Sequence, residues 1–127
     1  MKLSQRIAIV DDERAVRSGL SNLLHSDGYL TCTFESAEAF LNEKNALCDV
    51  SLMIIDIKLK GISGFDFYEE IKTYATPPPV IFISGHGDEN MQRFAISLGA
   101  VAFLRKPIDI EVLLNHLQKA IRPEENT

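Results

Sequence analysis

Short apolar runs alternate with segments of helical periodicity along nearly the whole chain. Three runs are uninterrupted and rich in β-branched residues, which is typical of strands buried on both faces: Ile7–Val10, Leu52–Ile55 and Val80–Ile83. Leu30–Phe34 alternates apolar residues with threonines and predicts a half-buried strand. Ala100–Leu104 is the last predicted strand.

Each run is followed by a segment in which apolar residues recur at the spacing of a buried helix face. Ser36 and Asp109 precede two of these segments at the position of a helix N-cap. Strands that alternate with helices predict an α/β fold, in which helices cover both faces of a parallel sheet and the most apolar strands are central. The apolar helical positions are Val16, Leu20, Leu23 and Leu24; Ala37, Phe40 and Leu41; Phe65, Tyr68 and Ile71; Phe94, Ala95 and Leu98; and Leu113, Leu114, Leu117 and Ile121.

The length of 127 residues and the mass of 14.2 kDa predict a single domain. We assign it to residues 1–122 and interpret the polar residues 123–127 as a tail, or as the start of a linker to a C-terminal effector. The net charge of −5 argues against direct binding of nucleic acid, which requires a basic surface. Apolar runs fall short of the roughly eighteen residues that cross a bilayer, so we expect a cytoplasmic protein without membrane contacts.

Reactive side chains stand at the ends of four of the five predicted strands. Asp11 and Asp12 follow the first strand, Asp56 follows the third, Ser84 ends the fourth, and Lys106 follows the fifth. Ligands of parallel sheets bind at the carboxyl ends of the strands, so we expect these side chains to converge. Clustered carboxylates repel one another and need a cation or raised pKa values to coexist. Hard oxygen ligands favour Mg²⁺, with Mn²⁺ as the alternative ion.

Each of these residues also has an ordinary structural explanation. Asp11 and Asp12 would cap the first helix, where the helix dipole favours acidic side chains, and Asp56 would form a turn. Ser84 would simply be a hydroxyl residue at the end of a strand. Lys106 would be an exposed loop lysine, unless a cis bond to Pro107 aims its side chain into the site. The combination of Asp56 with the pair at positions 11 and 12 favours the metal site over the caps.

Asp56 is the candidate nucleophile, because a carboxylate can accept a phosphoryl group to form an acyl phosphate. Such a transfer depends mainly on positioning and on neutralisation of charge. Lys106 would neutralise one phosphoryl oxygen, and the hydroxyl group of Ser84 would donate a hydrogen bond to another.

The chain resembles the receiver domain of two-component response regulators, the CheY-like family, over essentially its whole length. The loop from Ser84 to Asp88 is similar to that of FixJ-type receivers. The resemblance implies a flavodoxin-like (βα)5 fold, a doubly wound five-stranded parallel sheet with strand order 2-1-3-4-5. It rests on residues that follow their strands in order: Asp11, Asp12, Asp56 with Leu59 and Gly64, Ser84, Phe103, Lys106 and Pro107.

The resemblance implies a signalling domain rather than an enzyme, although one that assists its own phosphorylation and dephosphorylation. Asp56 would accept a phosphoryl group from a phosphohistidine of a sensor histidine kinase, with Lys106 and Ser84 assisting the transfer. Mg²⁺ would be held by Asp11, Asp12, Asp56 and the backbone carbonyl group of Lys58.

A switch is also implied by the resemblance. Ser84 would turn toward the phosphoryl group and Phe103 would change rotamer with it, which alters the face formed by the fourth helix, the last strand and the last helix. That face would mediate a phosphorylation-dependent homodimer or an output, which in FixJ-type receivers is usually transcriptional. A stand-alone receiver and a phosphorylation-independent binding module are the alternatives.

The chain departs from the family pattern in the loop after Asp56. Lys60 stands where family members commonly have proline, which is expected to loosen this loop. Lys58 occupies a position that often tunes the lifetime of the phosphoryl group, but a solvated lysine explains it equally well. His86 is interpreted as a loop histidine.

Two other classes of protein fit the sequence less well. A haloacid-dehalogenase-type phosphatase would need an acid at position 58, where this chain has lysine. A flavodoxin-like electron carrier would need a phosphate loop after the first strand, where this chain has acidic residues.

Overall fold

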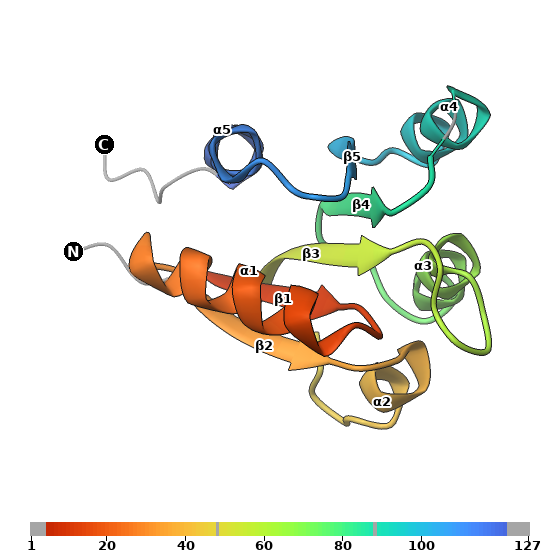
Figure 1. The fold of residues 1–127 in the computed structure, drawn as a ribbon. Helices are drawn as coiled ribbons and strands as arrows, with labels where there is room; N and C mark the ends of the chain where they lie inside the picture. The colour runs from red at the N-terminus through yellow and green to blue at the C-terminus, as the bar shows by residue number, and fades with distance from the viewer. Residues whose placement is uncertain (1–4, 48, 88, 122–127) are drawn as a thin grey trace, which may run out of the picture.

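The computed structural model describes residues 5–47, 49–87 and 89–121, and both Asp88 and the predicted tail lie outside these ranges. Strands and helices alternate through the described residues, as the apolar pattern predicts (Figure 1). The elements are β1 (Arg6–Val10), α1 (Arg14–Ser26), β2 (Leu30–Phe34), α2 (Ala37–Leu41), β3 (Val50–Asp56), α3 (Gly64–Lys72), β4 (Val80–Ser84), α4 (Glu89–Ser97), β5 (Ala102–Arg105) and α5 (Ile110–Ala120).

The strands form one parallel sheet in the order β2-β1-β3-β4-β5, which confirms the predicted flavodoxin-like arrangement. The three most apolar strands, β1, β3 and β4, occupy its interior as expected. Neighbouring strands and helices on both faces exclude water from these positions, and every residue of β4 is buried. Because all the strands run in the same direction, their carboxyl ends lie along one edge of the sheet.

Two hydrophobic cores lie on opposite faces of the sheet. α1 and α5 cover one face, and α2, α3 and α4 cover the other (Figure 1). Ile7 and Ile9 of β1 belong to the first core, whereas Ala8 and Val10 belong to the second. This alternation follows from the two-residue period of a strand, and burial of one isoleucine side chain stabilises the fold by roughly 1.5–3 kcal/mol.

The predicted N-caps of two helices are confirmed. The hydroxyl oxygen of Ser36 accepts a hydrogen bond from the backbone N–H of Ala39 at 3.0 Å. The carboxylate of Asp109 accepts hydrogen bonds from the N–H groups of Glu111 and Val112 at 3.0 and 3.3 Å. Such caps satisfy donors that a helix leaves unpaired at its start. Across the described ranges, no helix combines the length and apolar character needed to span a membrane.

The apolar stripes of two helices are wider than the surfaces that bury them. Leu23 on α1 is 47% exposed and Phe94 on α4 is 48% exposed, because the adjacent Leu24 and Ala95 take the fully buried positions. The half-buried pattern predicted for β2 also fails at its first residue. Leu30 is 42% exposed there, since β2 is an edge strand with a neighbour on only one side.

Candidate functional site

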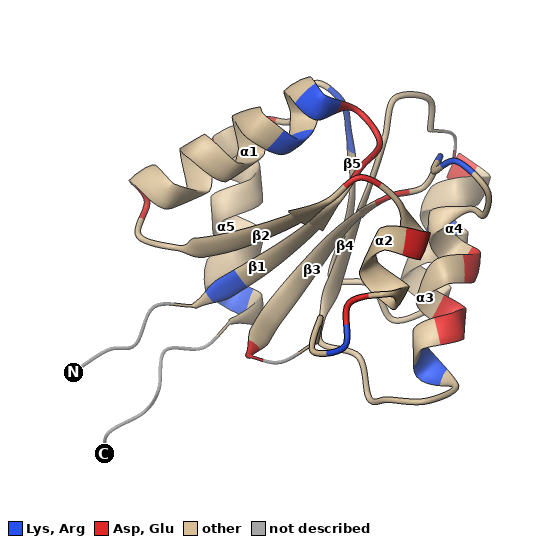
Figure 2. Cartoon of the chain, turned by 90° about the horizontal axis from the view of Figure 1, so that it is seen from below, with Lys and Arg blue, Asp and Glu red and all other residues tan. Residues whose placement is uncertain are grey.

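The side chains predicted to carry chemistry lie at the carboxyl edge of the sheet. Asp11 and Asp12 follow β1, Asp56 and Ser84 end β3 and β4, and Lys106 follows β5. Figure 2 shows acidic segments gathered where β1 and β3 end. The strand order produces this arrangement, because β3 pairs directly with β1 although α1, β2 and α2 separate the two strands in the chain.

Three carboxylates form what we call the acid cluster: Asp11, Asp12 and Asp56. One oxygen of each lies within 4.8 Å of those of the other two, which is close enough for all three to hold one metal ion. Asp11 and Asp56 are buried, whereas Asp12 is partly exposed. Oδ2 of Asp11 has no hydrogen-bond partner among the described residues. An unsatisfied buried oxygen within a set of hard ligands fits Mg²⁺ or Mn²⁺.

Lys106 reaches the acid cluster from the loop after β5. Its backbone N–H donates a hydrogen bond to the carbonyl oxygen of Ser84 at 2.8 Å, which anchors the loop to the end of β4. Its Nζ donates hydrogen bonds to Oδ2 of Asp56 at 3.2 Å and to Oε1 of Glu13 at 2.5 Å. Nζ also lies 3.1 Å from Oδ2 of Asp11, as an ion pair without hydrogen-bond geometry. The peptide bond that follows Lys106 is cis.

The backbone around Asp56 fixes the position of its side chain. The N–H of Lys58 donates a hydrogen bond to Oδ1 of Asp56 at 3.1 Å, while the Lys58 side chain is exposed. The N–H of Gly64 donates to the carbonyl oxygen of Ile57 at 2.7 Å. A Cβ atom at position 64 would lie 2.3 Å from the Asp56 carbonyl oxygen, so only glycine fits here. A metal-binding role for the Lys58 carbonyl group stays a prediction.

Burial and mutual repulsion dominate the electrostatics of the acid cluster. Desolvation raises the pKa of Asp11, and desolvation together with the charge of Asp11 raises the pKa of Asp56. Partial burial lowers the pKa of Lys106, but its hydrogen bond to Glu13 and its close contacts with the charges of Asp11 and Asp56 outweigh this, so the pKa is raised overall. Lys106 is therefore a permanent cation, and the acids share its single charge.

Ser84 and Phe103 belong to a separate, well-packed part of the same edge. The Ser84 hydroxyl group donates a hydrogen bond to the carbonyl oxygen of His86 at 2.8 Å and accepts one from the His86 N–H at 3.1 Å. Phe103 is only 9% exposed, and a Cβ atom on Gly87 would lie 2.6 Å from its Cζ. The loop 84–87 therefore holds the serine hydroxyl at one end and covers the phenylalanine ring at the other.

Two residues of the site escaped the sequence analysis. Glu13 makes the shortest contact with Lys106, and Nη1 of Arg17 donates a hydrogen bond to the carbonyl oxygen of Asp11 at 2.8 Å. Glu13 directly follows the pair of aspartates, so proximity in the sequence was the available signal. Arg17 shows no comparable signal, because its partner is a backbone atom.

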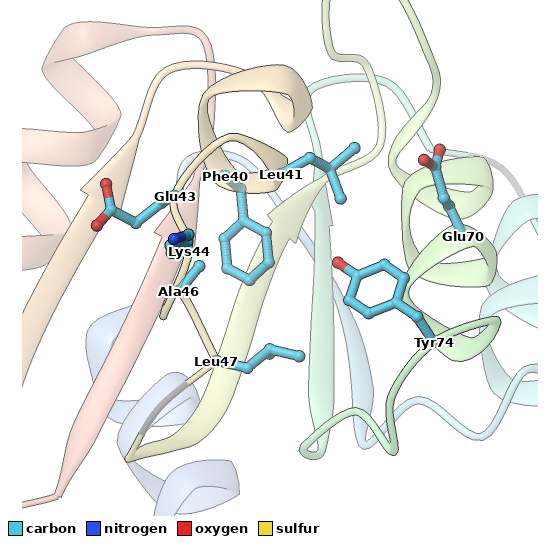
Figure 3. Close-up of a pocket in the computed structure, with 8 residues that line it drawn as sticks. All are labelled: Phe40, Leu41, Glu43, Lys44, Ala46, Leu47, Glu70 and Tyr74. Atoms are coloured by element: carbon cyan, nitrogen blue, oxygen red, sulfur yellow. The ribbon is translucent and has the colours of Figure 1, made fainter.

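A concave region lies apart from these residues, between the loop after α2 and the end of α3 (Figure 3). It encloses about 340 Å³. Phe40, Leu41, Leu47 and Tyr74 supply its apolar lining, and the exposed Glu43 carries a charge there. None of the predicted site residues lines this pocket, so the acid cluster is the better candidate for chemistry.

Comparison with known proteins gives a consistent result. Residues 7–118 match the family model of the response regulator receiver domain. The chain is 40% identical over 117 residues to the response regulator protein TodT of Pseudomonas putida, covering 91% of this chain and 51% of that protein. It is 33% identical over 125 residues to the transcriptional regulatory protein FixJ of Bradyrhizobium diazoefficiens, covering 98% of this chain and 60% of that protein. The chain thus spans about half the length of these relatives.

A solved structure agrees with the fold. The beryllofluoride-activated NtrC4 receiver domain dimer superimposes with a TM-score of 0.81 at 32% identity. The match covers 91% of this chain and 95% of that one.

Proposed function

The chain belongs to the family of response regulator receiver domains, and we therefore propose that Asp56 accepts a phosphoryl group from a phosphohistidine of a sensor histidine kinase. The observation that carries this proposal is the convergence of Asp56 with two further aspartates and Lys106 at one sheet edge. A cytoplasmic location accords with it.

The transfer exchanges one bond to phosphorus for another. An oxygen of the Asp56 carboxylate forms the new O–P bond as the N–P bond of the donor breaks. The electron pair of the broken bond returns to the imidazole ring, which leaves as neutral histidine when its other nitrogen carries a proton. The Lys106 ammonium group, which lies 3.2 Å from Oδ2 of Asp56, would donate a hydrogen bond to a phosphoryl oxygen.

Asp11, Asp12 and Asp56 would hold Mg²⁺, with Mn²⁺ as a substitute and the Lys58 carbonyl oxygen as a further ligand. When bound, such an ion neutralises the repulsion between the carboxylates and the incoming phosphoryl group. The burial of Asp11 and its unsatisfied oxygen support this assignment.

We assign the switch to Ser84 and Phe103. To reach a phosphoryl group, the Ser84 hydroxyl must give up both of its hydrogen bonds to His86, which releases the loop that carries Gly87 over the Phe103 ring. The face of α4, β5 and α5 would change as a result. It would then support a homodimer, and the receiver of residues 1–122 would control a transcriptional output in a longer protein. The dimeric NtrC4 receiver and the regulator FixJ support these proposals.

The decisive experiment is phosphorylation by acetyl phosphate with Mg²⁺, followed by intact-protein mass spectrometry. We expect a labile phosphoryl adduct that is absent in Asp56→Asn and in the presence of a chelator. Asp66→Asn removes an exposed aspartate of α3 and is the matched control, which must still form the adduct. Absence of any adduct would favour a phosphorylation-independent binding module, and sustained turnover of phosphate esters would favour a phosphatase.

A further inference from the structure

Glu13 takes part in the site without belonging to the acid cluster. Its carboxylate lies 2.5 Å from Nζ of Lys106, closer than Asp11 at 3.1 Å or Asp56 at 3.2 Å. An ammonium group has three hydrogens, and here three carboxylates surround it. Nζ donates hydrogen bonds to Glu13 and Asp56 and forms an ion pair with Asp11, so a phosphoryl oxygen must compete with these carboxylates for the ammonium group.

The burial of the three side chains shows which carboxylate can give up its contact with Lys106. The side chains of Asp11 and Asp56 are 0% and 3% exposed, so both are fixed at the base of the site. The side chain of Glu13 is 59% exposed and stands at the mouth, where it can rotate into solvent. Since Asp11 and Asp56 also hold Lys106, the ammonium group stays within the site when Glu13 turns away, although it is no longer restrained toward Glu13.

Charge balance points to the same residue. The acid cluster and Glu13 together provide four carboxylates. Lys106 and one divalent cation would supply three positive charges, so one negative charge remains when the site is loaded. We assign this remaining charge to Glu13, because its exposed carboxylate lies on the side from which an anionic phosphoryl donor must approach.

We propose that Glu13 is a positioning residue that restrains Lys106 and, through its uncompensated negative charge, slows the phosphorylation of Asp56 by small anionic donors. This inference rests on the proposed function of Asp56. Removal of the charge should accelerate the reaction by about threefold to tenfold at low ionic strength, since one charge acts on a dianion through a few ångströms of largely aqueous surroundings.

The test is a charge series at position 13, with the rate of phosphorylation by acetyl phosphate measured at saturating Mg²⁺. The rate should rise from wild type to Glu13→Gln and again to Glu13→Arg, and the differences should shrink as salt is added. Glu111→Gln is the matched control, because Glu111 also lies near the beginning of a helix and its N–H also donates a hydrogen bond to an aspartate two residues earlier. Equal or lower rates in the Glu13 variants would overturn the proposal.

A second measurement does not depend on phosphorylation or on metal. In the metal-free protein, the ¹⁵N signal of the Lys106 ammonium group should shift in Glu13→Gln and stay unchanged in Glu111→Gln. An unchanged signal in Glu13→Gln would show that Glu13 does not hold Lys106, which overturns the proposal. If wild type formed no adduct at all, the proposed function would fail, and this signal would still decide whether the restraint exists.

Discussion

The two halves of the carboxyl edge are built on opposite principles. At the ends of β1 and β3, the acid cluster brings negatively charged and largely buried side chains together, and Lys106 compensates only part of their charge. Beside β4 and β5, the Ser84 hydroxyl has both a donor and an acceptor, and the Phe103 ring is covered by backbone. The first half could hold a cation, whereas the polar and apolar groups of the second half are already satisfied by their own contacts.

The difference suggests how a receiver combines sensitivity with a defined resting state. Because the carboxylates of the acid cluster repel one another, the binding of a further charged group there changes the electrostatic free energy by a large amount. Under the proposed switch, satisfied hydrogen bonds and close packing on the other half would keep the resting conformation populated until that energy is supplied. Substitutions that disturb either half should therefore have different signs and sizes.

The largest expected effect is from Gly64→Ala, which adds a methyl group against the backbone of Asp56 and Ile57 at the acid cluster. The new Cβ would lie 2.3 Å from the Asp56 carbonyl oxygen and 2.9 Å from Cα of Ile57, so the strand end must move. We expect a loss of about 3 kcal/mol in the free energy of unfolding, measured by urea denaturation. Gly19→Ala on α1 is the control, because nothing lies within 4 Å of its Cβ and alanine favours helix. Equal stabilities of the two variants would contradict the prediction.

Gly87→Ala disturbs the half of the edge beside β4 and β5 and should lower the stability by less than Gly64→Ala. Its Cβ would meet the Phe103 ring at 2.6 Å, but a side chain can move more easily than a strand end. We expect a loss of about 1–2 kcal/mol in stability, together with changed NMR signals of the ring. Gly85→Ala in the same loop has open space and should change neither. Ring signals like those of wild type in Gly87→Ala would refute close packing at this point.

Asp56→Asn sharpens the comparison, because it should stabilise the protein. Removal of one buried charge relieves desolvation and repulsion by Asp11, while Lys106 keeps two other partners, for a net gain of about 1 kcal/mol at pH 7. The pKa of Asp56 is raised on folding, so its destabilising effect develops as the pH rises from the unfolded value of 3.8 through the folded value. The thermal midpoints of variant and wild type should therefore approach each other toward pH 3 to 4. A constant difference from pH 3 to 7 would rule out this electrostatic origin.

Much of the fold could be predicted, because apolar periodicity reports burial directly. The central positions of β1, β3 and β4 follow from their uninterrupted apolar runs, and the caps Ser36 and Asp109 are visible from residue type and place. Leu23 and Leu30 show the limit of this reasoning. Their sequence environment resembles that of buried leucines. Leu23 is exposed because the surface that buries α1 is narrower than its apolar stripe, and Leu30 is exposed because β2 is an edge strand.

The candidate site could be predicted as a set of residues but not as a network of contacts. Asp11, Asp12 and Asp56 were expected to meet because parallel strands share an edge, and they do meet. The partner of the Ser84 hydroxyl was not predictable, since a backbone carbonyl group two residues away leaves no mark in the sequence. The same holds for the contact between Gly87 and Phe103.

The sequence by itself determined the order of strands and helices, the apolar residues of each strand and the polar side chains that stand at the strand ends. These depend on local periodicity and residue chemistry, which the linear chain carries in full. Only the tertiary structure decided that three carboxylates would share Lys106, that Glu13 would be the exposed one, and that Ser84 would rest on His86. Distances between side chains on different elements depend on how those elements pack, and packing is a property of the whole fold.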